Sequence, residues 1–522
     1  MTMLAIASTG VAQADTYTVT TVADSGIGSL RQAILDANFK QVTNGTQCAR
    51  HSIQFNIPGG GTHSIQLLSA LPRINIPITF DGYTQPGSSE NTMAVGNNAV
   101  LTIELDGSLA GNADALVIGA SIPGSGLCPG STSWIRGLVI NRFGGAAIAM
   151  GEQVCPPNQV CTVGGVLIQG NFIGTDMTGG IALGNGAATG RPAILFGTSS
   201  SFNTVGEQIP ELGGSPEPLP FVRNVISGNA GDAIRIVSMS STPSTGVAEQ
   251  HRIRNNYIGV NASGTAALPN GGRGVSLGVN STGISVQDNL ISGNVSDGVA
   301  IADSRFPGTM LARNGIGISV AGLPLGNGGD GVIVSGNAVA VTVSGRFRYA
   351  LSVAAIANNA GAGLFVDANA LVDSGAISSA YNGGLGVDLA PAGVNPNDLG
   401  DIDSGPNEGL NAPVLDPVIL DSSTGTSTVA GRLVAAPSST YSLAFFYSDA
   451  CDPSGFGGGQ TPFPLNFNVT TDALGDARFT RQVGFLPANK FLTAINRAPA
   501  MTAASVFVTS EFSNCRRIVP SA

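Results

Sequence analysis

The chain has 522 residues, of which 73 are glycine, while only 11% are charged and 6% are aromatic. This composition is not that of a helical enzyme, so strands and turns must dominate, and no apolar stretch is long enough to cross a bilayer, which excludes a membrane-spanning protein. The formal net charge is −10, and Lys40 and Lys490 are the only lysines, so the chain lacks the basic field that attracts nucleic acid.

Residues 1–14 have the features of a shortened export signal. A short apolar run is followed by Ala12, Gln13 and Ala14, the small-x-small pattern cut by signal peptidase, but no Lys or Arg precedes this run. We interpret the stretch as the remnant of an export signal; the alternative is an unstructured tail. The cysteines form an even set without CxxC spacing, which favours disulfides in an oxidising compartment and a secreted or cell-surface protein. They are Cys48, Cys128, Cys155, Cys161, Cys451 and Cys515.

The first element in chain order is a helix predicted over residues 29–38. Ser29 and Gln32 have the spacing of a capping box, and the apolar residues from Leu30 to Ala37 recur at i, i+3, i+4 and i+7. This helix has one apolar face and needs a surface to cover. In a chain of short strands, that surface is the open end of a stack of coils, so we expect the helix to close the N-terminal end of a solenoid.

Two sets of similar segments then alternate along the chain. The first set shares an Asn, an Ile-Gly pair and a closing Leu-x-Asn-Gly, and it comprises residues 170–186, 255–271 and 313–328. The second set lies between them and comprises residues 225–236, 290–301 and 332–343. The spacing of the segments is unequal, which excludes a rigid short repeat but suits stacked coils with loops of variable length.

Each segment contains a short β-branched run bounded by Gly and Asn, as at 234–236, 299–301 and 332–334. Such strands are too short to form an independent sheet. Stacked as successive coils, they would form parallel ladders whose inward Ile, Val and Leu make one continuous core. The sequence therefore predicts an all-β right-handed parallel β-helix of the pectin-lyase-like kind over residues 15–394.

The segment "TVTTVADSGIGSLRQAILDAN" resembles the CSLREA-type N-terminal segment of bacterial secreted parallel β-helix repeat proteins. As in that family, it is followed by "IQFNIPGGG", "LPRINIPITFDGYTQPG", "IRGLVINRFGGAAI" and the "NFIGTD…LGNG" units. Gly28 stands at the family's Cys position and Gln32 at its Glu position. The resemblance extends through most of the chain and implies the β-helix fold and export.

The residue composition of the chain changes near Asn395. Residues 395–411 are acidic, Asn-rich and rich in turn residues, so we expect a linker there and an antiparallel β-sandwich over residues 412–522. The strands expected in the sandwich lie within residues 426–437, 440–448, 464–471, 477–485 and 504–515. This part resembles the β-sandwich that often ends the same family, and the resemblance implies a disulfide between Cys451 and Cys515. We also expect Cys155 to pair with Cys161 in a surface loop, which leaves Cys48 with Cys128, although six cysteines permit fifteen arrangements.

Residues for catalysis are few. The chain has no adjacent Asp-Asp pair, no Gly-His-Gly and no Asp-Pro-His, which carry chemistry in many polysaccharide-active β-helices. The best candidates are Asp232 with Arg235, Arg252 and Arg254, if their two segments share one face. The alternative is stronger: Asp232 follows "SGN", as a turn residue that accepts backbone hydrogen bonds does, and outward arginines are usually solvated.

The stretch "DLGDIDSGPNE" is a candidate calcium site. Asp398, Asp401, Asp403 and Asn407 place several oxygen ligands on one loop, which is the chemistry calcium prefers. The match to the D-x-[DN]-x-[DN]-G pattern is partial, because Gly405 stands where a third ligand would be. The alternative is a solvated turn between the two domains.

The leading hypothesis is an exported surface or extracellular β-helix protein that binds glycan or another surface polymer and requires no cofactor. One alternative is a polysaccharide lyase, hydrolase or epimerase of this fold, and another is a structural or adhesive protein without a defined ligand. Asp and Arg side chains of neighbouring coils converging in a groove, with at least one strongly shifted pKa, would favour an enzyme. Their absence would favour binding or structure.

Overall fold

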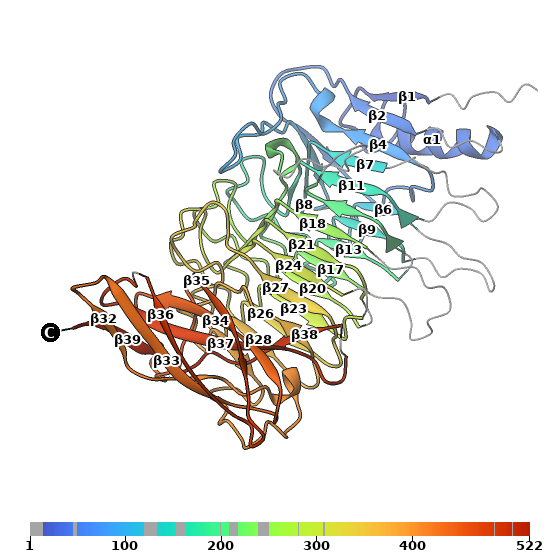
Figure 1. Cartoon of the computed structure of the whole chain (residues 1–522). Helices are drawn as coiled ribbons and strands as arrows, with labels where there is room; N and C mark the ends of the chain where they lie inside the picture. Colours follow the sequence, from blue (N-terminus) through green and yellow to red (C-terminus); the bar gives the residue numbers. More distant parts are fainter. Residues whose placement is uncertain are drawn as a thin grey trace, which may run out of the picture.

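The structure, a computed structural model, describes residues 14–44, 50–119, 133–152, 163–198, 200–207, 218–237, 250–279, 281–305, 308–484, 486–503 and 505–521. A parallel β-helix extends from β1 (Thr16–Val19) to β30 (Val387–Leu389), and antiparallel strands follow from β31 (Val414–Leu415) onward (Figure 1). The expected fold class, a parallel β-helix followed by a β-sandwich, is confirmed. Within the described ranges, no helix has the length and apolar character needed to cross a membrane.

Three parallel sheets form the walls of the β-helix. The first sheet has 11 strands: β1, β2 (His51–Phe55), β4 (Ile78–Asp81), β7 (Ser133–Arg136), β11 (Val166–Gln169), β15 (Thr204–Val205), β18 (Arg252–Arg254), β21 (Ser285–Gln287), β24 (Met310–Ala312), β27 (Val341–Ser344) and β29 (Val372–Asp373). The second sheet has eight: β3 (His63–Gln66), β5 (Ile103–Asp106), β8 (Leu138–Asn141), β12 (Phe172–Ile173), β16 (Val225–Ile226), β19 (Tyr257–Ile258), β22 (Leu290–Ile291) and β25 (Gly315–Ile316). The third sheet has nine: β6 (Leu116–Ile118), β9 (Ile148–Met150), β13 (Ile194–Phe196), β17 (Ile234–Ile236), β20 (Val275–Leu277), β23 (Val299–Ala302), β26 (Val332–Ser335), β28 (Leu364–Val366) and β30. A separate pair joins β10 (Val163–Gly164) to β14 (Ser200–Ser201).

The core of the β-helix is built from inward side chains that stack in register. In the first sheet, the inward row extends from Ile53 to Val343, and every member is buried. The strands expected at 234–236, 299–301 and 332–334 are present as β17, β23 and β26. Each short strand is stabilised by its neighbours above and below, because the apolar row continues from coil to coil.

Five of the six sequence motifs correspond to two kinds of connection between the second and third sheets; the motif at 332–343 instead joins β26 of the third sheet to β27 of the first. Long connections follow β12, β19 and β25, and short ones follow β16 and β22, so the two kinds alternate from coil to coil. The long loops stack on one another through backbone hydrogen bonds, as from Ala262 to Gly179 and from Val320 to Gly264. Glycine is needed where a long loop leaves its strand: Gly259 has φ +79°, and a Cβ there would lie 2.3 Å from the Ser292 oxygen. This alternation explains the unequal repeat spacing.

Both kinds of connection end on the same structural feature, a column of asparagines. Each side-chain amide donates to the amide oxygen of the next asparagine at 2.9–3.0 Å. This column consists of Asn185, Asn229, Asn270, Asn294, Asn327, Asn359 and Asn382. A second column, between the first and second sheets, consists of Asn171, Asn224, Asn256, Asn289 and Asn314. These buried amides satisfy the backbone at the corners of the β-helix.

The predicted N-terminal helix is present as α1 (Leu30–Asn44), six residues longer at its end than expected. Ser29 caps it by accepting a hydrogen bond from the Gln32 backbone N–H at 3.2 Å. The Gln32 side chain does not complete the capping box, because its amide donates to Asp36 instead. The apolar stripe is buried in the core of the β-helix, and α1 packs on β1 and β2 (Figure 1), so its role as the N-terminal cap is confirmed. The stripe is Leu30, Ala33, Ile34 and Ala37.

The C-terminal sandwich closes the other end of the β-helix (Figure 1). Its strands are β31, β32 (Val418–Asp421), β33 (Thr426–Val434), β34 (Thr440–Ser448), β35 (Thr461–Thr470), β36 (Asp476–Val483), β37 (Phe491–Pro499), β38 (Phe507–Thr509) and β39 (Arg516–Pro520). Phe446, Ile495 and Phe512 belong to the β-helix core, so one apolar cluster crosses the junction. The structure contains the expected disulfide between Cys451 and Cys515. The other four cysteines lie outside the described residues, as do residues 1–13, so the remaining disulfides and the export signal stay predictions.

Candidate functional site

The outer surface of the first sheet carries two rows of mostly polar side chains, which we call the polar face. Since side chains alternate along a strand, these rows point away from the buried row. One row is Ser52, Thr79, Trp134, Leu167, Thr204, Arg252, Ser285, Met310, Thr342 and Asp373. The other row, interrupted at β15, is Gln54, Asp81, Arg136 and Gln169, and then Arg254, Gln287, Ala312 and Ser344. The rows keep their register along the sheet, but Leu167, Gln169 and Thr204 are buried, so β11 and β15 divide the polar face into an N-terminal and a C-terminal part.

A group of charged residues that we call the arginine cluster lies on the C-terminal half of the polar face. Asp288, directly after β21, has a fully buried side chain and accepts from Arg254 at 2.8 Å, Arg313 at 2.9 Å and Arg348 at 3.2 Å. Arg254 also contacts Glu207 at 3.2 Å. The cluster comprises these five residues and Arg252, whose guanidinium lies 3.9 Å from Glu207.

The arginines determine the protonation of Asp288. Burial alone would raise the pKa of its carboxyl, but the hydrogen bonds from Arg313 and Arg254 outweigh burial, and the net shift is downward. Asp288 is thus held ionised and out of contact with solvent. It can orient the three guanidinium groups, but it cannot act as a general acid near neutral pH.

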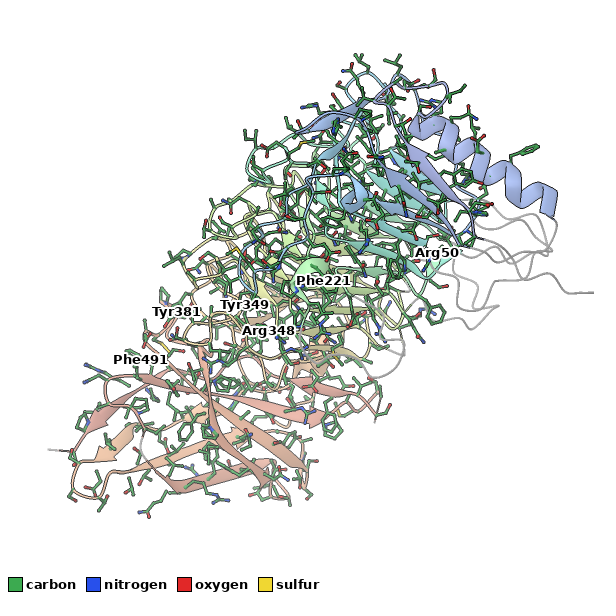
Figure 2. All side chains as sticks on the ribbon, turned by 90° about the horizontal axis from the view of Figure 1, so that it is seen from above. Arg50, Phe221, Arg348, Tyr349, Tyr381 and Phe491 are labelled. Atoms are coloured by element: carbon green, nitrogen blue, oxygen red, sulfur yellow. A yellow bond between two sulfur atoms is a disulfide. The ribbon has the colours of Figure 1, made fainter. Side chains whose placement is uncertain are left out.

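The N-terminal half of the polar face has a different character. Arg136 pairs with Asp81 at 2.7 Å and with Glu90 at 3.0 Å, so two carboxylates flank this one guanidinium. The only tryptophan of the chain, Trp134, lies in the first outward row beneath the guanidinium of Arg50, 4.5 Å from the ring centre. Figure 2 labels Arg50 and Arg348, which lie far apart along the β-helix and belong to the two halves.

The four predicted catalytic candidates do not share one face. Asp232 and Arg235 form an ion pair at 2.8 Å at the third sheet, whereas Arg252 and Arg254 lie in β18 of the first sheet. Asp232 also accepts the backbone N–H of Arg273 at 2.8 Å, which is the turn role that was the alternative. The predicted catalytic constellation is therefore wrong, because strands that follow each other in sequence belong to different walls. Sequence reasoning missed Asp288 and Glu207, the residues that do meet Arg254.

A second candidate site is a cavity of about 340 Å³ at the junction of the β-helix and the sandwich. Its lining includes Asn395, Asp398, Asp403 and Glu511. Glu511 is almost fully buried, and its carboxylate accepts hydrogen bonds from the Leu389 and Asn395 backbones at 3.1 Å. It thereby joins the last strand of the β-helix to the sandwich.

Carboxyl groups at this junction have raised pKa values. Burial raises the pKa of Glu511 to about 7 against its hydrogen bonds, and burial raises the pKa of Asp388 to about 6. Burial also raises the pKa of Asp401 to about 6, with further contributions from Asp398 and Asp403. The junction therefore holds groups that titrate near neutral pH, unlike the arginine cluster.

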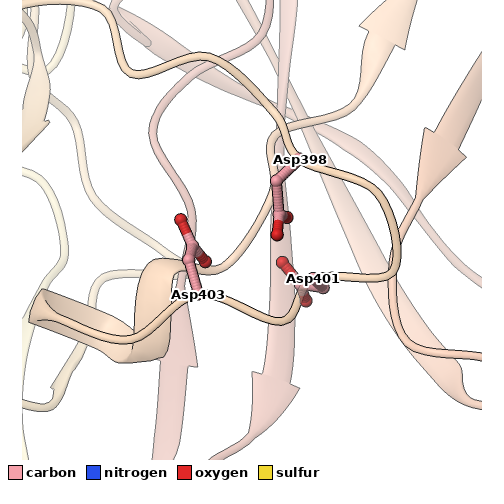
Figure 3. A group of neighbouring side chains, drawn as sticks. All are labelled: Asp398, Asp401 and Asp403. Atoms are coloured by element: carbon pink, nitrogen blue, oxygen red, sulfur yellow. The ribbon is translucent and has the colours of Figure 1, made fainter.

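Three of the four predicted calcium ligands gather in this region. Oxygens of Asp398, Asp401 and Asp403 lie within 4.8 Å of one another, and Figure 3 shows the carboxylates of Asp398 and Asp401 pointing toward each other. Asn407 is not among them: its buried amide accepts from the Val372 N–H at 2.6 Å and donates to the Thr509 carbonyl at 2.7 Å. Asn407 ties the β-helix to the sandwich, so its assignment as a ligand is wrong, and calcium binding by the three aspartates stays a prediction.

Comparison with known proteins adds little to this description. No protein-family model matches the chain, and no curated protein matches it. Three chains of solved structures do, and one is a tailspike protein from Acinetobacter baumannii bacteriophage Fri1, described as a capsular polysaccharide depolymerase. It is 9% identical, with a TM-score of 0.23, over 96% of this chain and 86% of that chain. At this level of similarity, the likeness carries no argument about activity.

Proposed function

We propose that this chain is an exported β-helix protein that binds a glycan along the polar face of its first sheet. The observation that carries the proposal is the register of the first outward row in its C-terminal part, from Arg252 in β18 to Asp373 in β29, where no member is buried. At about 4.8 Å per strand, these five strands present a surface roughly 20 Å long. A surface of that length, with polar groups repeated at each coil, fits an extended polymer better than a compact ligand.

The chemistry of the row also fits sugar hydroxyls. Hydroxyl and guanidinium groups lie along it and amide groups along the second row, and each can donate or accept hydrogen bonds to a polyol. In the arginine cluster, where Asp288 meets arginines from other coils, the carboxylate has a lowered pKa. That favours binding over chemistry at this face.

The test compares two matched substitutions on a panel of polysaccharides in affinity electrophoresis. Ser285→Trp places a bulky side chain in the first outward row, and Ser276→Trp places the same side chain in the corresponding outward position of the third sheet. Both serines are partly exposed. We expect Ser285→Trp to abolish retardation of the protein by the polymer, and Ser276→Trp to leave it unchanged. Equal retardation of both variants, or none for the wild type, would refute the proposal.

Export is part of the proposal. The disulfide between Cys451 and Cys515 supports it, because such bonds persist in oxidising compartments. We expect the protein to be found in the culture medium, or to be degraded when protease is added to intact producing cells. Protection of the whole protein until the cells are lysed would contradict export.

A second candidate function, hydrolysis of a polysaccharide, is favoured by one observation at the junction. Carboxyl groups with pKa values near neutrality line or adjoin a cavity of about 340 Å³, as a general acid requires. Release of reducing ends from a polysaccharide, abolished by Glu511→Gln but not by Ser285→Trp, would establish this activity. Retention of polymer without product release would exclude it for that polymer.

A further inference from the structure

We propose that the polymer is anionic and that the arginine cluster binds its carboxylate or sulfate groups. The inference rests on the proposed function, since it names the class of glycan that the polar face takes. It is carried by the charge of one part of the chain and by the placement of its arginines.

The coils of residues 251–350 have the opposite charge to the whole protein. They contain seven arginines and four aspartates, and no lysine or glutamate, so their formal charge is +3 in a chain of −10. An acidic protein that binds a neutral polymer has no need of such a reversal. A local positive field on an otherwise negative surface attracts a polyanion to that place and repels it elsewhere.

The arginines of this segment are placed and exposed for binding. The Arg252 side chain is 53% exposed and that of Arg313 is 40% exposed, and both reach the polar face, whereas Asp288 is fully buried. The buried anion therefore fixes guanidinium groups from three coils without presenting its own charge to a ligand. Glu207 is also largely covered, at 15% exposure.

The choice of arginine also indicates an oxyanion. A guanidinium is planar, keeps its charge, and matches a carboxylate or sulfate with two parallel hydrogen bonds, which an ammonium group does not. Because guanidiniums from successive coils lie along the direction of the polar face, they would meet anionic groups repeated along one chain. A free small anion would gain contact with only part of the cluster.

The experiment measures affinity for polygalacturonate, dextran sulfate and neutral dextran by affinity electrophoresis at low and high NaCl. We expect binding to the two polyanions that weakens as salt rises, and binding to dextran that is at least about tenfold weaker. Arg252→Gln/Arg313→Gln should weaken polyanion binding about tenfold or more. The matched control is Arg235→Gln, a partly exposed arginine of the third sheet, and it should bind as the wild type does.

The outcomes separate this inference from the proposed function. Equal binding of dextran and of the polyanions, independent of salt, would overturn the inference and leave glycan binding intact. Binding to none of many polymers would overturn the proposed function itself. If the double variant melts earlier than the wild type, Arg252→Gln alone decides, because its guanidinium does not contact buried Asp288 in the described residues. Unchanged polyanion affinity in Arg252→Gln would refute the proposed binding by the arginine cluster. A loss of polyanion affinity in Arg235→Gln as large as that in Arg252→Gln would also refute it.

Discussion

The long asparagine column makes a prediction about stability that can be calculated from individual hydrogen bonds. Asn270 lies in the middle of the column with no exposed surface. Its amide oxygen accepts from the Asn229 backbone at 3.1 Å and side chain at 2.9 Å, and its amide nitrogen donates to Ile226 and Asn294 at 3.0 Å. Asn270→Ala removes all four bonds. The Asn229 amide still donates to Ile173 and Ser227, and the Ile226 carbonyl still accepts from Gly259, so two buried groups lose their bond: the Asn229 backbone N–H and the Asn294 amide oxygen. At about 1–3 kcal/mol for each group left unsatisfied, we expect a loss of about 3–5 kcal/mol in the free energy of unfolding.

The measurement is guanidinium unfolding followed by circular dichroism, with the midpoint converted at a constant slope. The matched control is Asn337→Ala, which removes an exposed asparagine of the same β-helix. We expect the control to change stability by less than about 0.5 kcal/mol, as surface substitutions usually do. If the free energies of unfolding of the two variants differ by less than about 1 kcal/mol, the column does not stabilise the corners as argued.

Three further predictions concern the ends of the β-helix. Leu30→Asp places a charge between α1 and the first coil. We expect the free energy of unfolding to fall by on the order of 3 kcal/mol, or the protein to aggregate through the uncovered strand edge, as measured by thermal unfolding and light scattering. An unchanged Tm would contradict the capping role. Cys451→Ser/Cys515→Ser opens a crosslink between residues 64 apart and should cost about 3–5 kcal/mol, so its Tm should equal that of the reduced wild type. Since the pKa of Glu511 is raised to about 7 and that of Asp401 to about 6, the protons they hold stabilise the folded state fully below about pH 4, and this stability is lost as pH rises through 6 and 7. The Tm should therefore fall from pH 5 to pH 8, less steeply in Glu511→Gln. Calcium should restore the Tm at pH 8 in the wild type but not in Asp401→Asn. A Tm independent of pH and calcium would refute both the burial of these protons and calcium binding.

Features with local sequence signals were predicted well. The N-terminal helix follows from a capping serine and an i, i+3, i+4 stripe, all within ten residues, and the strand at 234–236 follows from a β-branched run between turn residues. By contrast, β37, a nine-residue strand of the sandwich, was missed. Leu492 and Ala494 pack in the sandwich core while Ile495 packs in the β-helix core, so both faces are buried and the alternation that identifies a strand is absent.

The stacking of the coils could not be predicted, because it depends on which residues of different coils lie above one another. The sequence does contain a signal for this stacking in its asparagines. The first set of motifs closes on an asparagine such as Asn270, and the second set contains one in "SGN", such as Asn294. In the structure, the Asn270 amide donates to the amide oxygen of Asn294. Comparing the last asparagine of each motif, rather than the glycines, would have revealed one column with alternating loop lengths.

The candidate catalytic residues failed for the same reason. Asp232 and Arg254 are close in sequence, but a coil of this β-helix changes wall every few residues, so neighbouring strands face different directions. Asp288 and Arg348 are 60 residues apart and meet because their coils stack. A charge count over residues 251–350 would have drawn attention to this region, although it would not have identified the buried aspartate at its centre.

The two groups of charged residues divide the functions that this fold can perform. In the arginine cluster, hydrogen bonds from guanidiniums lower the pKa of Asp288, so its proton is not available for transfer, and the surrounding positive groups favour holding an anion. At the junction, burial raises the pKa of Glu511, so a proton is present near neutral pH. Binding and proton transfer thus have their physical requirements met at two separate sites. If the protein cleaves the polymer it binds, the polymer must extend from the arginine cluster to the junction. Substitutions at Arg252 would then raise KM for a long polymer without changing kcat, while Glu511→Gln would lower kcat.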